Sequence, residues 1–148
     1  MENGRPTWAE ARRGFDWDGS LRDIYVQRTD ATDWNRLPEA FKASGFELSF
    51  FVNCQPEAIP DDFAGATSER ERSRGPYLAV ALAPGLAIDC HFFTPDEIEF
   101  SFDPREIRSE REFGLVLSFM ELVGTAVEKP VLLTPENLIQ HPILTFDL

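Results

Sequence analysis

The chain has 148 residues, the size of one ordinary domain, and its 43% hydrophobic content with 13 Phe predicts a packed globule. No apolar run approaches the roughly 20 residues that a membrane span needs, and the N-terminus lacks the apolar core of a signal peptide. We therefore expect a single domain over residues 1–148, located in the cytoplasm and without a membrane partner.

The formal net charge of −12 is unevenly distributed, with −1 in residues 1–45 and −11 in residues 46–148. Nucleic acid is not an expected partner, because phosphate binding needs a basic footprint. A basic protein partner or a cation fits this charge. The alternative is that the charge serves only solubility, since net charge keeps small proteins apart in solution.

Residues 1–20 are predicted to form an N-terminal arm. Thr7 and Glu10 have the spacing of a capping box at the start of a short helix, and Gly14 can end that helix in a left-handed conformation. The arm also carries three large aromatic side chains: Trp8, Phe15 and Trp17. Because large rings are unfavourable in water, we expect them to pack on the domain's own surface, with contact to a partner as the alternative.

A strand, a helix and a second strand follow the arm: Arg22–Arg28, Ala31–Ser44 and Phe46–Cys54. Thr29 or Asp30 can cap the helix, and Gly45 ends it. Pro38 lies inside the helical pattern and should kink or split it, because proline lacks an amide N–H. The short connections would allow the two strands to run parallel, with a right-handed crossover.

The alternation of apolar and polar residues predicts which strand side chains face the core. Ile24 and Val26 face inward in the first strand, and Tyr25 faces outward. The second strand has five predicted inward residues: Phe46, Leu48, Phe50, Val52 and Cys54. Both cysteines, Cys54 and Cys90, are therefore expected to be reduced core residues.

Residues 55–76 are predicted to be a long mobile connection. They contain three prolines and a mixed-charge run over residues 69–74. Long connections of this kind are either mobile or functional, so any lid would lie here. The alternative is a solvated segment whose opposite charges pair with one another.

Residues 77–102 are predicted to form a meander of three strands, with Pro84-Gly85 in a type II turn. The apolar residues of the second and third strands all reach the core only if Phe92 opposes Ile98 and Cys90 opposes Phe100. Residues 93–97 then form the connecting loop.

The main helix is predicted over Ser109–Lys129, with a capping box between Ser109 and Glu112. Its apolar residues cover more than one face, so it needs more than one neighbour. One apolar flank should be covered either by the arm or by the same helix of a second chain in a homodimer: Leu115, Phe119, Leu122 and Ala126. A shared core is also predicted: Phe113, Leu117, Met120, Phe50, Cys90 and Phe100.

The C-terminal part is predicted to contain a buried strand over Val131–Leu133, one helical turn after Thr134-Pro135-Glu136, and a closing strand over Pro142–Leu148. The resulting fold class is α+β. We expect a two-layer sandwich with a mostly antiparallel sheet of about six strands and two helices on one face, in the order β-α-β-β-β-β-α-β-β.

The sequence lacks the usual catalytic, phosphate-binding and metal-binding motifs, so no cofactor and no metal is predicted. One candidate polar site remains: Asp89, His91 and Glu99. The predicted strand register places His91 opposite Glu99, and Asp89 opposite Ser101, on the face of the sheet that points away from the core. Glu99 could orient His91 as a general base or a metal ligand is oriented.

Two functions follow from these patterns. The first is a small acidic, non-catalytic protein-interaction module, comparable to an inhibitor or an immunity protein, that masks a basic partner. Its predicted interaction surface comprises five acidic residues: Asp96, Glu97, Asp103, Glu106 and Glu110. The alternative is a small-molecule or metal-binding domain, or an enzyme, that uses the polar sheet face around Asp89, His91 and Glu99.

Overall fold

A computed structural model describes residues 5–147 and gives an α+β fold. The strands are β1 (Arg22–Gln27), β2 (Glu47–Val52), β3 (Gln55–Glu57), β4 (Tyr77–Ala83), β5 (Leu86–Thr94), β6 (Glu97–Phe102), β7 (Val131–Pro135) and β8 (Leu144–Phe146). The helices are α1 (Trp8–Ala11), α2 (Ala31–Trp34), α3 (Leu37–Ser44), α4 (Phe63–Ala66), α5 (Glu69–Arg72) and α6 (Glu110–Val127), with 3₁₀ turns η1 (Arg12–Phe15) and η2 (Pro104–Glu106).

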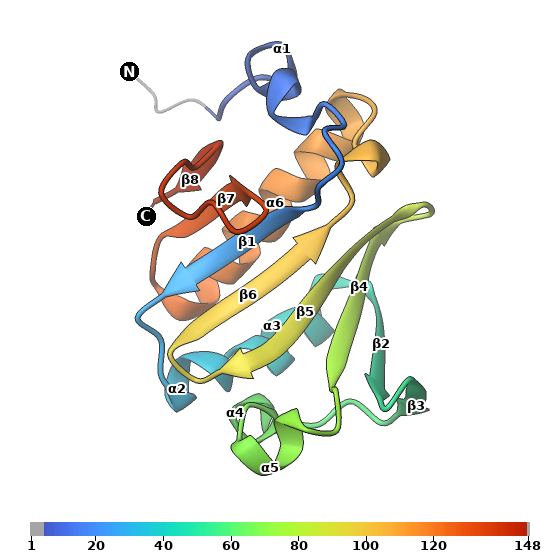
Figure 1. The fold of residues 1–148 in the computed structure, drawn as a ribbon, viewed down its shortest axis with the longest axis vertical. Helices are drawn as coiled ribbons and strands as arrows, with labels where there is room; N and C mark the ends of the chain where they lie inside the picture. The colour runs from blue at the N-terminus through green and yellow to red at the C-terminus, as the bar shows by residue number, and fades with distance from the viewer. Residues whose placement is uncertain (1–4, 148) are drawn as a thin grey trace.

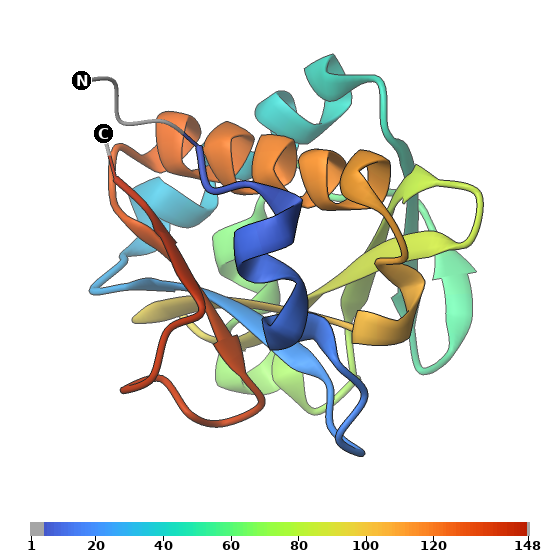
Figure 2. The same cartoon turned by 90° about the horizontal axis from the view of Figure 1, so that it is seen from above.

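The strands form one antiparallel sheet in the order β3-β2-β4-β5-β6-β1-β7-β8. Helices α3 and α6 lie behind this sheet in Figure 1 and above it in Figure 2. Among the described residues, no helix lies in front of the central strands β5, β6 and β1 in Figure 1. One face of the sheet therefore packs on helices, while the other is open over these strands.

The sheet has eight strands rather than the predicted six or so. The added edge strand is β3, which pairs with β2. Asn53 and Cys54 connect the two strands, and both have positive φ, at 52° and 62°. Two consecutive left-handed residues make the tight turn that joins antiparallel strands, so the chain reverses where the sequence pattern predicts a continuing strand.

The predicted split of the second helix is confirmed. Asp30 caps α2 through a reciprocal capping box with Asp33, and Pro38 lies in the first turn of α3, where its missing N–H has no partner to lose. Gly45 ends α3 with φ of 83°.

Strands β1 and β2 run in the same direction, as predicted, but they are not neighbours. Strands β4, β5 and β6 lie between them, and each contact along this row is antiparallel. The meander therefore fills the space between the two strands.

The core lies between the sheet and the helices, and five of its six predicted members are buried: Phe50, Cys90, Phe100, Phe113 and Met120. Leu117 is only half-buried, because it faces the groove between α6 and β8. The ring of Phe119 is fully buried, with Phe41 of α3 stacked on it at 5.8 Å and Phe100 in edge contact at 5.0 Å.

The flank of α6 at Phe119 is thus covered by α3 of the same chain, rather than by the arm or by a second chain. The split at Pro38 separates α3 from α2, and α3 lies against α6. The other three flank residues, Leu115, Leu122 and Ala126, stay half-buried. A homodimer remains a prediction.

Two of the three aromatic rings of the arm pack on the domain, as expected, but not on the predicted flank of α6; Trp17 stays 48% exposed. The rings of Trp8 and Phe15 both contact the ring of Phe113, at 5.6 and 5.7 Å between centroids. The capping box of Thr7 and Glu10 is formed. Gly14 is not left-handed; a side chain there would meet Ile143, because a Cβ would lie 2.6 Å from its methyl carbon.

The two cysteines differ from each other. Cys90 is buried and free, as predicted. Cys54 is free but exposed, so its predicted inward orientation is wrong. The reason is that β2 ends at Val52 and Cys54 belongs to the turn that follows.

Residues 55–76 contain β3, α4 and α5. Phe63 of α4 is fully buried, and its ring contacts those of Phe41 and Phe92. This contact attaches the segment to the core. The mobility expected for the segment stays a prediction.

The start of α6 and the C-terminal segment differ in detail from the predictions. The Ser109 side chain accepts the N–H of Arg111, while the Glu112 carboxylate accepts the Ser109 hydroxyl and the Arg108 N–H, so the predicted reciprocal box is only half formed. After β7 the chain turns at Asn137, with φ of 59°, rather than forming a helical turn. The predicted closing strand is reduced to Leu144–Phe146, and Leu148 lies outside the described residues.

Candidate functional site

The predicted register between β5 and β6 is confirmed at its centre. Cys90 pairs with Phe100, His91 with Glu99, and Asp89 with Ser101. Beyond His91 the register shifts, so that Thr94 opposes Glu97 and the connection shortens to residues 95 and 96. The predicted loop over residues 93–97 is therefore too long.

The register shift is a β-bulge that includes Phe92 and Phe93. Phe92 is buried in the core, whereas the side chain of Phe93 is 53% exposed. The ring of Phe93 stacks on the ring of His91 at 5.0 Å, with 2° between their planes. An aromatic ring thus lies beside the predicted polar site. Alternation along β5 gives Phe93 the same face as His91, but the sequence analysis assigned Phe93 to the connecting loop, whereas β5 extends to Thr94.

Strand β1 adds polar residues that the sequence reasoning missed. Tyr25 of β1 opposes Glu99 of β6, and Asp23 opposes Ser101. We call the resulting set the polar face: Asp23, Tyr25, Asp89, His91, Glu97, Glu99 and Ser101. The alternation in β1 already pointed Tyr25 away from the core, but nothing in the sequence indicated that β1 would lie next to β6.

The histidine of the polar face is held by a hydroxyl group. His91 Nε2 lies 2.7 Å from Ser101 Oγ, so its partner is Ser101 rather than the predicted Glu99. Burial lowers the pKa of His91, with the negative charges of Asp89 and Asp23 acting in the opposite direction. A neutral imidazole is therefore favoured at neutral pH.

Three carboxylates of the polar face have raised pKa values. Burial raises the pKa of Glu99 to about 7, and the charges of Asp23 and Glu97 add to this effect. Burial also raises the pKa of Glu97, and the charge of Asp23 adds to this effect. Burial raises the pKa of Asp89 as well, while His91 partly offsets the rise. Within residues 5–147 none of these three forms an ion pair.

Asp23 has a structural role in the same cluster. Its side chain is 3% exposed, and its Oδ2 accepts the Tyr25 hydroxyl and the Asn137 backbone N–H, each at 2.9 Å. Burial raises the pKa of Tyr25, and the hydrogen bond to Asp23 adds to this, so the phenol stays a neutral donor. Asp23 thereby fastens the segment after β7 to the edge of the polar face.

The five residues of the predicted interaction surface lie at two ends of β6. Asp96 and Glu97 lie at its start, whereas Asp103, Glu106 and Glu110 follow its end, a distance of about 20 Å along a strand of this length. Asp103 is paired with Arg105 at 2.7 Å, and the Glu106 carboxylate accepts the Ala87 N–H at 3.1 Å. The structure does not bring the five together, and only Glu97 belongs to the polar face.

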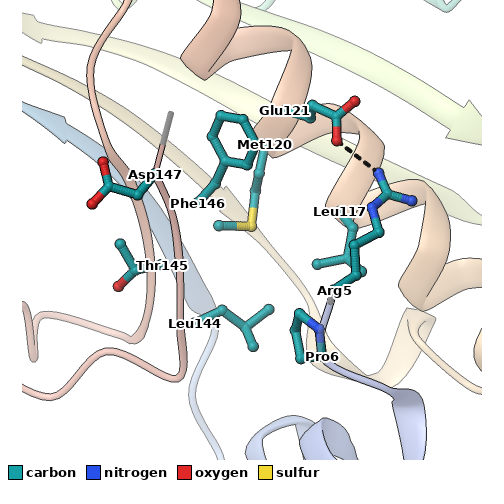
Figure 3. A pocket seen from close by; sticks show the side chains of 9 residues that line it. All are labelled: Arg5, Pro6, Leu117, Met120, Glu121, Leu144, Thr145, Phe146 and Asp147. Atoms are coloured by element: carbon teal, nitrogen blue, oxygen red, sulfur yellow. Dashed lines mark hydrogen bonds and ion pairs between the residues drawn. The ribbon is translucent and has the colours of Figure 1, made fainter. Parts of the chain in front are cut away.

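The hollows in the described part of the chain lie elsewhere. One of about 390 Å³ lies between α6, β8 and the start of the arm (Figure 3). It has an apolar floor that includes Leu117, Met120 and Phe146, and an ion pair of 3.0 Å joins Arg5 to Glu121 at its rim. Three further hollows lie elsewhere in residues 5–147, and none of these four is lined by Asp89, His91 or Glu99.

No three side chains of His, Cys, Asp or Glu in residues 5–147 are grouped so that they could hold a metal ion. Nor does this part of the chain include a helix with the length and apolar character of a membrane span.

Fold and site together define an acidic α+β domain with helices on one side of its sheet and an open polar face on the other. The chain matches no protein-family model, no curated protein and no solved structure. Its function is therefore argued from its own residues.

Proposed function

We propose that this domain is a non-catalytic interaction module that binds a basic protein partner through the polar face. The observation that carries the proposal is the set of three half-buried carboxylates, Asp89, Glu97 and Glu99, none of which has a cationic partner within residues 5–147. A positive group brought to this face would offset the cost of burying the three charges and the repulsion that Asp23 and Glu97 exert on Glu99, and the free domain lacks that stabilisation.

The charge of the whole chain supports the same proposal. The net charge of −12 attracts basic proteins from a distance and speeds their encounter, while the polar face supplies the place of contact. No helix of the described residues lies in front of the central strands of this face (Figure 1). Solvent reaches part of Asp89, His91, Glu97 and Glu99 there, whereas Asp23, Tyr25 and Ser101 are buried.

The alternative function, a small-molecule or metal-binding domain or an enzyme built on Asp89, His91 and Glu99, is less well supported. Catalysis on a small substrate needs an enclosing cavity and convergent groups. The four hollows described above lie away from this site, and its histidine is hydrogen-bonded to Ser101.

The proposal is tested by neutralising the polar face. A variant with Asp89→Asn, Glu97→Gln and Glu99→Gln is compared with a control that loses the same charge from three exposed carboxylates elsewhere: Glu39, Glu110 and Asp147. Binding to a capped lysine-rich peptide is measured by titration calorimetry at pH 8, where Glu99 is ionised because its pKa is about 7.

We expect the polar-face variant to bind the peptide about tenfold more weakly than the control variant, a difference of roughly 1.4 kcal/mol. The difference should shrink at high salt, which screens exposed charges. Equal binding by the two variants would show that only the net charge matters, and the proposal would then be wrong. The polar-face variant is expected to fold, because it removes repulsion between carboxylates.

A further inference from the structure

Resting on the proposed function, we infer that the polar face recognises an arginine side chain of the partner, with Phe93 as the stacking surface and Glu97 and Glu99 as the carboxylates that accept from the guanidinium. Recognition of arginine depends on the aromatic ring beside the carboxylates, and not on the charge of the carboxylates alone.

The ring is available for stacking. Phe93 is 53% exposed, one of four exposed large hydrophobic residues in residues 5–147. Its ring lies parallel to the ring of His91, with 5.0 Å between the centroids. The bulge next to Glu97 and Glu99 places Phe93 diagonally across from both, a spacing that long side chains bridge on a sheet. An aromatic face and two carboxylates are thus adjacent on β5 and β6.

The same chain already contains this combination with its arginine in place. Arg105 lies 3.7 Å from the ring centroid of Trp17, and its guanidinium donates to both carboxylate oxygens of Asp103, with the shortest bond at 2.7 Å. Ring, carboxylate and guanidinium form one unit there. On the polar face the ring and the carboxylates are present, but within residues 5–147 no guanidinium completes the unit.

Arg72 of α5 reaches Phe93 but does not complete this unit. It donates to the backbone carbonyl oxygen of Phe93 at 2.8 Å, and it forms no ion pair with any carboxylate in the described residues. Glu97 and Glu99 therefore have no ion-pair partner within residues 5–147.

Arginine fits this surface better than lysine does. The planar guanidinium stacks on an aromatic ring and presents a rigid fork that matches carboxylate oxygens, whereas the lysine ammonium is a compact and strongly hydrated point charge. A cation over an exposed ring strengthens binding by about two- to fivefold. We expect the guanidinium to gain this contact and the ammonium to gain little of it, because the guanidinium lies flat on the ring and is more weakly hydrated.

The test uses two capped Gly-Ser peptides that differ only in carrying three arginines or three lysines. Their affinities for the full chain are measured by titration calorimetry at pH 8. Phe93→Ala and Glu99→Gln are the test variants. Their matched controls are Trp17→Ala, which removes another exposed ring, at 48%, and Glu110→Gln, which removes another exposed carboxylate.

We expect the arginine peptide to bind two- to fivefold more tightly than the lysine peptide, with Phe93→Ala abolishing this preference and Trp17→Ala leaving it unchanged. Glu99→Gln should weaken both peptides, and Glu110→Gln should weaken them less. Equal affinity for the two peptides, with both still dependent on Glu99, would overturn the arginine inference and leave the proposed function standing. If neither peptide depends on Glu99 more than on Glu110, both are wrong.

Discussion

Replacing Glu99 by Gln should stabilise the protein at alkaline pH, because the native fold holds this carboxylate in an unfavourable environment. Its side chain is half-buried beside Asp23 and Glu97, and its pKa is raised from 4.5 to about 7. A raised carboxyl pKa means that the native state keeps its proton where the unfolded chain has lost it. Stability should therefore fall as the pH rises from about 4.5 to above 7.

The magnitude follows from this difference in pKa. The pKa of Glu99 rises from 4.5 in the unfolded chain to about 7 in the native state, and each pKa unit corresponds to 1.36 kcal/mol. The ionised carboxylate therefore lowers the free energy of unfolding by at most about 3.4 kcal/mol. Solvent reaches part of the side chain and screens its charge, so we expect roughly 1–2 kcal/mol. This is a measurable part of a typical unfolding free energy of about 5–15 kcal/mol.

The assay is urea denaturation of the wild-type and Glu99→Gln proteins at pH 5 and at pH 8. At pH 5 the native wild-type carboxyl is protonated, so the two proteins should differ little. At pH 8 the variant should be more stable by the stated amount. Glu110→Gln serves as the control, because Glu110 is exposed on α6 and should give no comparable dependence on pH.

A variant that is less stable than wild type at pH 8, or equally stabilised at both pH values, would refute the reasoning. The first result would mean that the Glu99 carboxylate makes favourable interactions in the native state. The second would mean that Gln improves packing without any change in electrostatics.

Three further predictions concern the core, the thiols and the arm. Phe100→Ala should cost roughly 2–5 kcal/mol in urea denaturation, because Phe100 is fully buried against the rings of Phe41 and Phe119; a loss under about 1 kcal/mol would contradict the packing. A thiol reagent should label Cys54 quickly in the native protein and Cys90 only after unfolding, with two thiols found in total; fast native labelling of both would contradict the burial of Cys90. Deleting residues 1–18 should lower the free energy of unfolding, because it removes Trp8 and Phe15 from Phe113; an unchanged midpoint of unfolding would contradict the packing of the arm. Sedimentation of the full chain tests the predicted homodimer.

Much of the local structure could be read from the sequence, because its signals act between residues a few positions apart. The caps at Thr7 and Asp30, the split at Pro38 and the start of α6 after Ser109 all depend on such short-range chemistry. The centre of the register of β5 against β6 was also predictable, although the predicted pairing of Phe92 with Ile98 is lost at the bulge. A side-chain period of two excludes a slip of one residue, because such a slip would turn one apolar set to solvent.

Other features depend on contacts that are distant in sequence. The placement of β1 between β6 and β7 joins residues at least 70 positions apart, and it brings Asp23 and Tyr25 to the polar face. Covering of Phe119 by Phe41 likewise depends on how α3 docks on α6. Alternation along one strand says which face a residue takes, but not which strand lies beside it.

The polar face contains both features that the sequence predicts and features that depend on the fold. That Asp89, His91 and Glu99 share a face could be predicted, because they alternate with buried residues on two adjacent strands. Three features could not: the hydrogen bond of His91 to Ser101, the extension of β5 past Phe93, and the contribution of Asp23 in β1 to the raised pKa of Glu99. Periodicity is a property of one segment, whereas a local electrostatic environment is set by every segment that the fold brings near.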